Sequence, residues 1–305
     1  MVAKRDISGI LLLDKPTGLS SNAALQKVKR LFQAKKAGHT GSLDPLASGL
    51  LPICFGEATK FSQYLLDADK CYLATAQLGV TTTTGDAEGE VLNRAAVPAL
   101  SAQQLQQLST TFTGPLKQVP PMYSALKHQG TPLYKLARQG IDIDRPPRDV
   151  TIRALSLASG ETREELVLQV HCSKGTYIRS LVEDIGQAIG CGAHVTQLRR
   201  VSAGPFQAQQ MLTLEALQVA AERETLADCL LPIDAGLVGW PRVNLSESGC
   251  FYLTRGRAIV APDAAQQGVV CLQNAAGEFF GLGEVQADGM LISKRLLKTQ
   301  APACA

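Results

Sequence analysis

Apolar residues in the first 240 positions recur with two spacings, one typical of strands and the other of helices. Short continuous or alternating apolar runs predict strands over residues 7–13, 72–78 and 166–172. Apolar residues three or four positions apart predict helices over residues 20–32, 101–112 and 177–189. Ser20 or Ser21 is expected to cap the first helix, and Ser101 with Gln104 to form a capping box at the second. Residues 1–240 are therefore expected to form one mixed α and β domain.

Two segments depart from this pattern. Residues 114–148 are rich in proline and basic residues and contain a helical stretch near residues 133–139, which predicts an insertion that projects from the body. After Trp240 the chain turns to short β runs over residues 258–260, 269–273, 279–285 and 290–293. These runs predict a second domain over residues 241–305, built as a small barrel.

The composition is typical of a globular protein with a sizeable core, because 45% of the 305 residues are hydrophobic and 19% are charged. The apolar run at residues 10–13 is too short for an export signal, and no stretch approaches the length of a membrane span. Eight cysteines without a Cys-x-x-Cys pair argue against a zinc knuckle or a disulfide framework. We expect reduced, mostly buried cysteines and a cytoplasmic location.

Positive charge is concentrated in the insertion. The chain as a whole carries +3, whereas residues 117–148 hold six Lys or Arg against two Asp, which leaves the remainder close to neutral. Such a segment suits contact with the phosphates of a nucleic acid, although a solvated basic loop explains the charge equally well. If the segment binds a nucleic acid, Lys127, Lys135 and Arg138 are the residues that we expect to contact it.

Asp44 has the most constrained neighbourhood in the chain. Gly38, Gly41 and Gly49 flank it, and Pro45 restricts its backbone. A carboxylate held in this way can serve as a nucleophile. Asp before Pro is also a common start of a helix, here one over residues 46–51, and local sequence alone favours that interpretation.

Other polar and aromatic residues give weaker signals. His39 is better suited to act as a general base or to stack on a base than to bind a metal, because no other histidine clusters with it. Ser42, His39 and Asp44 lie too close together in one loop to form a hydrolase triad. Tyr72 and Tyr177 can stack on a base or simply pack. Further candidates are Arg179 and Lys60 as ion-pair partners of an aspartate, while Arg199 and Arg200 are interpreted as solvated.

These pieces occur together in an order that closely resembles the bacterial TruB family of tRNA pseudouridine(55) synthases. The matching motifs are LDKPTGLSS at 13–21, GHTGSLDPLASG at 38–49, GEATK at 56–60, VPPMYSALK at 119–127, GTYIR at 175–179 and LRR at 198–200. The resemblance implies an α+β catalytic domain with a mixed, mainly antiparallel sheet, a thumb-like insertion, and a C-terminal PUA-like RNA-binding domain.

The resemblance also implies a reaction. The family cleaves the N1–C1′ bond of a T-loop uridine in tRNA, turns the uracil and rejoins it through C5, without a metal or a cofactor. The base must first be flipped out of the folded loop. We expect the chain to bind the T-arm and elbow of tRNA as a monomer, without a guide RNA or a membrane.

Roles for single residues follow from the resemblance. Asp44 is expected to attack the ribose or the base ring, or to assist loss of the C2′ proton, and these three routes stay open. Arg179 would keep Asp44 ionised with support from Lys60, and Tyr177 would help to remove the C5 proton.

The remaining roles concern substrate binding. His39 would fill the space that the flipped base leaves, Tyr72 would stack on the uracil, and Asp86 and Leu198 resemble further residues of the site. The chain departs from the family at Cys71 and over residues 81–84, and neither departure is expected to touch the chemistry.

Two other functions compete with this one. A tRNA folding factor would also flip a base and grip the RNA elbow, with or without catalysis. A glycosidase would need a second carboxylate as general acid, and the Asp44 motif offers none nearby.

Overall fold

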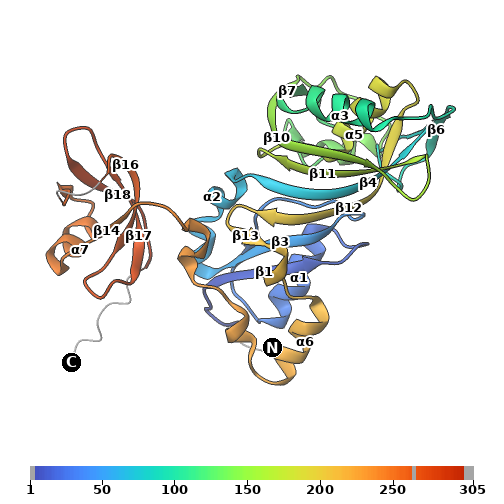
Figure 1. Cartoon of the computed structure of the whole chain (residues 1–305). Coiled ribbons are helices and arrows are strands. Elements are labelled where there is room, and N and C mark those ends of the chain that lie inside the picture. The colour runs from blue at the N-terminus through green and yellow to red at the C-terminus, as the bar shows by residue number, and fades with distance from the viewer. Residues whose placement is uncertain (1–3, 263–265, 299–305) are drawn as a thin grey trace.

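A nine-stranded sheet forms the body of the protein in this computed structural model, which describes residues 4–262 and 266–298 (Figure 1). Seven strands follow one another in the order β1 (Gly9–Lys15), β3 (Ser48–Phe55), β12 (Ala193–Ala203), β4 (Lys70–Leu78), β11 (Glu165–Cys172), β10 (Arg148–Ser159) and β7 (Gly114–Gln118). The short strands β2 (Ala37–His39) and β13 (Phe206–Gln207) pair with β3 and β12. Every pairing is antiparallel except that of β12 with β3, which confirms the expected mixed, mainly antiparallel sheet.

The two faces of this sheet are covered differently. Four helices, α1 (Ser21–Leu31), α3 (Ala102–Thr111), α5 (Ile178–Ile189) and α6 (Leu214–Glu222), share one large apolar core with Leu11 and Leu13 of β1. Ile10 and Leu12 alternate to the opposite face and pack with residues of the 3-10 turn η1 (Gly56–Lys60) and of α2 (Ser62–Asp67). Strand β1 is therefore buried on both sides, as its continuous apolar run indicates.

The three predicted helices and three predicted strands of the body are confirmed. Ser20 caps α1, since its side chain accepts a hydrogen bond from the Ala23 amide at 3.2 Å. Ser101 and Gln104 form the expected capping box of α3. The predicted helix over residues 46–51 is wrong, because those residues lead into strand β3, which pairs with β1 along its length.

The basic insertion begins later than expected, since residues 114–118 are edge strand β7 of the main sheet. Between β7 and β10 lie the hairpin β8 (Lys127–His128) and β9 (Thr131–Pro132) and the short helix α4 (Leu133–Ala137). We call residues 119–147 the thumb. A separate two-stranded sheet, β5 (Val80–Thr82) with β6 (Val91–Arg94), follows β4.

A second sheet of five strands begins at residue 242 and stands apart from the long sheet in Figure 1. Its order is β14 (Arg242–Asn244), β16 (Gly268–Gln273), β17 (Phe279–Val285), β18 (Met290–Leu296) and β15 (Ile259–Val260), with helix α7 (Glu247–Thr254) packed against it. This curled sheet is consistent with a PUA-like unit. An apolar cluster joins it to the body, where the Phe61 and Phe279 rings meet at 5.2 Å.

Seven cysteines lie in the described part of the chain and all are free, four of them buried, while Cys304 lies outside it. None of the helices described is long and apolar enough to cross a membrane.

Candidate active site

Asp44 lies in the loop between β2 and β3, and neighbouring elements hold this loop by its backbone. The hydroxyl of Ser21, at the start of α1, accepts from the Leu43 amide at 2.7 Å and donates to the Leu43 carbonyl at 3.0 Å. The Arg200 guanidinium donates to the Gly41 carbonyl at 3.0 Å. Gly49 follows the turn with φ +98, and a Cβ there would lie 2.3 Å from the Arg200 carbonyl oxygen. The loop is therefore fixed on both sides of Asp44.

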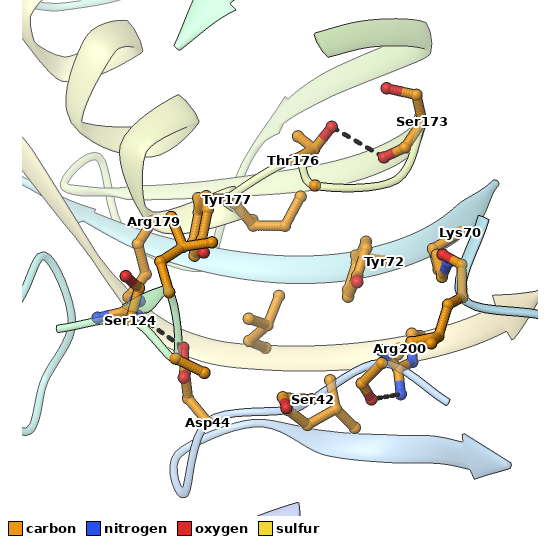
Figure 2. A pocket seen from close by; sticks show the side chains of 18 residues that line it. Ser42, Asp44, Lys70, Tyr72, Ser124, Ser173, Thr176, Tyr177, Arg179 and Arg200 are labelled. Carbon is orange, nitrogen blue, oxygen red and sulfur yellow. Dashed lines mark hydrogen bonds and ion pairs between the residues drawn. The ribbon is translucent and has the colours of Figure 1, made fainter. Parts of the chain in front are cut away.

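An arginine faces this carboxylate. Arg179, in the first turn of α5, places Nη2 2.9 Å from Asp44 Oδ2, as Figure 2 shows. The Arg179 side chain is only 4% exposed, whereas that of Asp44 is 39% exposed and faces the cavity. The same guanidinium lies 3.4 Å from Asp86 and donates to the carbonyls of Thr84 and Tyr123 at 2.8 and 2.7 Å. One arginine thus joins two carboxylates, the loop after β5 and the thumb.

Burial and charge act in opposite directions on Asp44. Burial raises the pKa of its carboxyl, Arg179 lowers that pKa, and the nearby Asp86 raises it again. Without the guanidinium, a carboxyl in this place would take up a proton more readily. The net effect is a pKa of Asp44 above its ordinary value, and Arg179 limits that rise, which favours the charged form that a nucleophile or base requires.

A cavity of about 340 Å³ opens beside Asp44. Tyr72 of β4 and Tyr177, which precedes α5, line it (Figure 2). Leu198, on the adjacent strand β12, lines it as well. Gln118 of β7 fixes the Tyr177 backbone, since its side chain accepts from the amide at 2.7 Å and donates to the carbonyl at 3.0 Å. Aromatic walls and one ionised carboxylate suit a flat, uncharged heterocycle.

His39 lies on the other side of the loop, where a second cavity of about 530 Å³ also reaches Asp44. Its Nδ1 is buried and has no hydrogen-bond partner among the described residues. Burial and then the charge of Arg200 lower the pKa of His39, so the ring is neutral near pH 7. A polar atom left unpaired in this way is available to a bound group.

The described residues contain no cluster of three or more His, Cys, Asp or Glu side chains that would hold a metal ion. The donor set around Asp44 is instead one of carboxylates, a guanidinium and tyrosines.

Family models match most of the chain. The model for the N-terminal domain of TruB family pseudouridylate synthases matches residues 29–178. The model for the C-terminal domain of tRNA pseudouridylate synthase B matches residues 179–238, and that for the C-terminal part of pseudouridine synthase II TruB matches residues 241–297. The tRNA pseudouridine synthase B of Stutzerimonas stutzeri is 56% identical over 300 residues, which are 97% of this chain and 98% of that one.

The chain belongs to the TruB family. The enzymes of the same name from Pseudomonas aeruginosa and Nitrosococcus oceani are 55% and 53% identical, each across 97% of this chain and 98% and 97% of theirs. Among solved structures, a Cbf5-Nop10-Gar1 complex matches with a TM-score of 0.73 and 26% identity, over 96% of this chain and 85% of that chain. The fold expected from the sequence is thereby confirmed.

Most residues that the TruB resemblance pointed to lie together. Asp44, Arg179 and Asp86 form one ion-pair network, and Tyr72, Tyr177 and Leu198 line the cavity next to it. Arg138 of the thumb lines the second cavity, with its guanidinium over the Tyr134 ring. Lys127 and Lys135 are exposed on β8 and α4, which leaves their predicted contact with RNA untested by the fold.

Lys60 is placed elsewhere. Its ammonium lies 2.7 Å from Glu57 and donates to the Leu296 carbonyl of β18 at 2.9 Å, so it does not support Asp44 in this structure. The GEATK motif does not indicate this contact, because Leu296 lies 236 residues further along the chain.

The sequence analysis missed three buried cations near the site, Lys15, Lys70 and Arg200. Arg200 is 1% exposed and lines the cavity, so its interpretation as a solvated residue is wrong. Strand alternation places Arg200 on the same face of β12 as Leu198, two positions earlier, but it does not tell whether that face meets water or a cavity. Burial lowers the pKa of both Lys15 and Lys70 to about 8.

Proposed function

We propose that this chain converts the uridine at position 55, in the T loop of tRNA, to pseudouridine. As a TruB-family member it is a tRNA pseudouridine synthase. The observation that carries the proposal is the ion pair of Asp44 with the buried Arg179 at the mouth of a cavity lined by Tyr72, Tyr177 and Leu198.

The reaction begins when the target base leaves the T loop. Extruding a base costs a few kcal/mol of stacking and pairing, which contacts with the protein must offset. Tyr72 offers a ring face on which the uracil stacks, and His39 lies in the second cavity, where it can occupy the space that the base leaves. The thumb supplies Ser124 and Ala125 to the walls of both cavities, so it closes over the flipped nucleotide.

Asp44 then attacks the ribose or the base ring, or assists loss of the C2′ proton. The N1–C1′ bond breaks with its electron pair going to the uracil, the base turns within the cavity, and a C5–C1′ bond forms. In the final step C5 loses its proton, a transfer that Tyr177 in the cavity wall can help, and N1 takes up a proton, so the product is an isomer of the starting nucleoside. Bonds broken and formed balance, so the isomerisation consumes no oxidant, reductant or group donor.

The same geometry favours catalysis over a purely structural action on tRNA. A folding factor needs a surface that grips RNA, but it has no need for a carboxylate held ionised by a buried guanidinium inside a cavity. We further propose that the enzyme works in the cytoplasm as a monomer without a guide RNA, and that the five-stranded C-terminal sheet is a second RNA-binding unit.

The direct test is to incubate the purified protein with an unmodified tRNA transcript and to map pseudouridine along it. We expect one new pseudouridine, at position 55, and its absence from the tRNA of cells that lack the protein. A transcript that stays unmodified at position 55, or that is modified at another position alone, contradicts the proposal.

A further inference from the structure

Thr84 belongs to the Asp44 site. It lies in residues 81–84, where the chain departs from the family and where we expected no effect on the chemistry. It follows β5 in the run of four threonines over residues 81–84 and lines the second cavity with Asp44, Asp86 and Arg179. That expectation is wrong for Thr84, because the residue contacts two members of the ion-pair network directly.

The two contacts use different parts of the residue. The Thr84 hydroxyl donates to Asp86 Oδ1 at 2.5 Å, and the Thr84 carbonyl accepts from Arg179 Nη1 at 2.8 Å. Asp86 Oδ2 lies 3.4 Å from the same Nη1. Thr84 therefore contacts both the carboxylate and the guanidinium of the buried Asp86–Arg179 pair.

Gly85 forms the turn between Thr84 and Asp86. Gly85 has φ +70, which L side chains rarely adopt, and a Cβ on it would lie 2.8 Å from the Glu183 carboxylate. This turn brings the Thr84 hydroxyl back onto the carboxylate two residues later. The Glu88 amide donates to Asp86 Oδ1 as well, at 3.1 Å.

The Thr84 hydroxyl is important because Asp44 and Asp86 compete for the Arg179 guanidinium. Arg179 serves both Asp44 and Asp86, at 2.9 and 3.4 Å, while Glu88 and Glu183 add further negative charge around it. Asp86 is only 3% exposed, so loss of a hydrogen bond to its carboxylate is costly. If the Thr84 hydroxyl is removed, we expect Asp86 to draw Arg179 away from Asp44.

We propose that Thr84 is a positioning residue of this enzyme, whose hydroxyl and carbonyl keep Arg179 placed on Asp44. The inference rests on the proposed role of Asp44 and adds a member to its network that no motif of the resemblance contains. Thr84 acts through Asp86 and Arg179, which its hydroxyl and its carbonyl contact.

The test is Thr84→Val, which replaces the hydroxyl with a methyl group of similar shape. We expect the single-turnover rate on tRNA to fall by about 10- to 100-fold, the range for a hydrogen bond to a charged group, with an unchanged dissociation constant for tRNA. Thr84→Ser keeps the hydroxyl and should retain most of the rate.

A pH profile separates positioning from a general loss of structure. When Arg179 moves off Asp44, the pKa of the Asp44 carboxyl rises further, because the charge that lowers it is weakened. The acid limb of the Thr84→Val rate should therefore move to higher pH. The groups facing Arg179 and Asp44 in this region are Lys15 on β1, Asp86 and Glu88 after β5, and Glu183 on α5.

Thr83→Val is the matched control, because it makes the same change one residue away, where the hydroxyl only accepts from the Glu90 amide at 3.1 Å. It should behave as the unaltered enzyme in rate and acid limb. The inference is overturned if Thr84→Val is no slower than Thr83→Val, if its acid limb does not move, or if Thr84→Ser is as slow as Thr84→Val. An Asp44→Asn variant that keeps full activity would instead refute the proposed function itself.

Discussion

At the scale of single residues, the chemistry of the site depends on how one buried guanidinium is shared. Arg179 makes two ion pairs and two hydrogen bonds to carbonyls, and it is almost fully buried. Removing such a group would leave two carboxylates without their positive partner. Its geometry therefore decides both the charge and the direction of Asp44.

This sharing leads to a prediction for Arg179→Lys, which keeps a positive charge but cannot reach all four partners at once. We expect kcat to fall by about 100-fold, the size of effect seen when one preorganised donor is lost. The acid limb of kcat should move to higher pH, because burial raises the pKa of Asp44 and less charge would then oppose that rise. Single-turnover rates between about pH 5 and 8 test this, and an unmoved acid limb would contradict it.

The site residues found from the sequence are identified by their near neighbours in the chain, whereas those missed depend on distant segments. Asp44 and Arg179 lie in compact motifs that resemble those of the family, and the resemblance points to Tyr72 as well, although Tyr72 lies outside these motifs. Arg200 shares a motif with Leu198, but whether its face of β12 meets water or a cavity depends on β4 and on the loop at Gly41. Local sequence does not contain that information.

At the scale of elements, local signals predicted helices well and misjudged one turn. Ser20 and the Ser101–Gln104 capping box mark helix starts that the structure confirms, because caps depend on residues within one turn. Asp44-Pro45 fits a helix start equally well, yet residues 49–55 pair with residues 9–15 as strands. Long-range pairing decides against the helix, and no local rule foresees it.

The thumb is the element to which we assign the phosphate contacts. A triple variant, Lys127→Gln, Lys135→Gln and Arg138→Gln, should weaken tRNA binding and make the slope of log affinity against log salt shallower by about 2 to 3. Arg223→Gln, a change of the same kind at the exposed residue that follows α6, should leave the slope as it is. Binding assays between about 50 and 200 mM salt check this, and equal slopes for both variants would refute the assignment.

At the scale of the whole molecule, the active site is assembled from segments far apart in the chain. The loop after β2, the turn after β5, the thumb, α5 and the strands β4 and β12 each contribute one part. The family resemblance predicted this set of motifs, whereas the junction between the two sheets came from the structure alone. At that junction Glu57 accepts from the Lys298 amide at 2.7 Å and pairs with Lys60.

Lys60→Met tests the junction. The change removes the hydrogen bond to the Leu296 carbonyl and the ion pair to Glu57, so we expect a loss of about 2 kcal/mol in the free energy of unfolding. The rate on tRNA should stay unchanged, because Lys60 does not line the cavity. Denaturant unfolding measures the stability and single-turnover assays measure the rate. A variant that is slow but fully stable would indicate that Lys60 acts in the active site.

The pH dependence of the junction follows from Glu57. Hydrogen bonds from Lys60 and from the Lys298 amide outweigh burial and hold the pKa of Glu57 below its ordinary 4.5. Its contribution to stability is therefore present above pH 4.5 and is lost as the pH falls through the lower pKa of the folded state.

The central claim, that the Asp44 carboxylate carries the isomerisation, is tested most directly by tritium release from tRNA labelled at C5 of uridine. Asp44→Asn keeps the size of the side chain and removes its charge, so we predict that release falls to background while tRNA binding is retained. Asp6→Asn, the same change at an exposed carboxylate, should release tritium at the normal rate. Undiminished release by Asp44→Asn would contradict the claim.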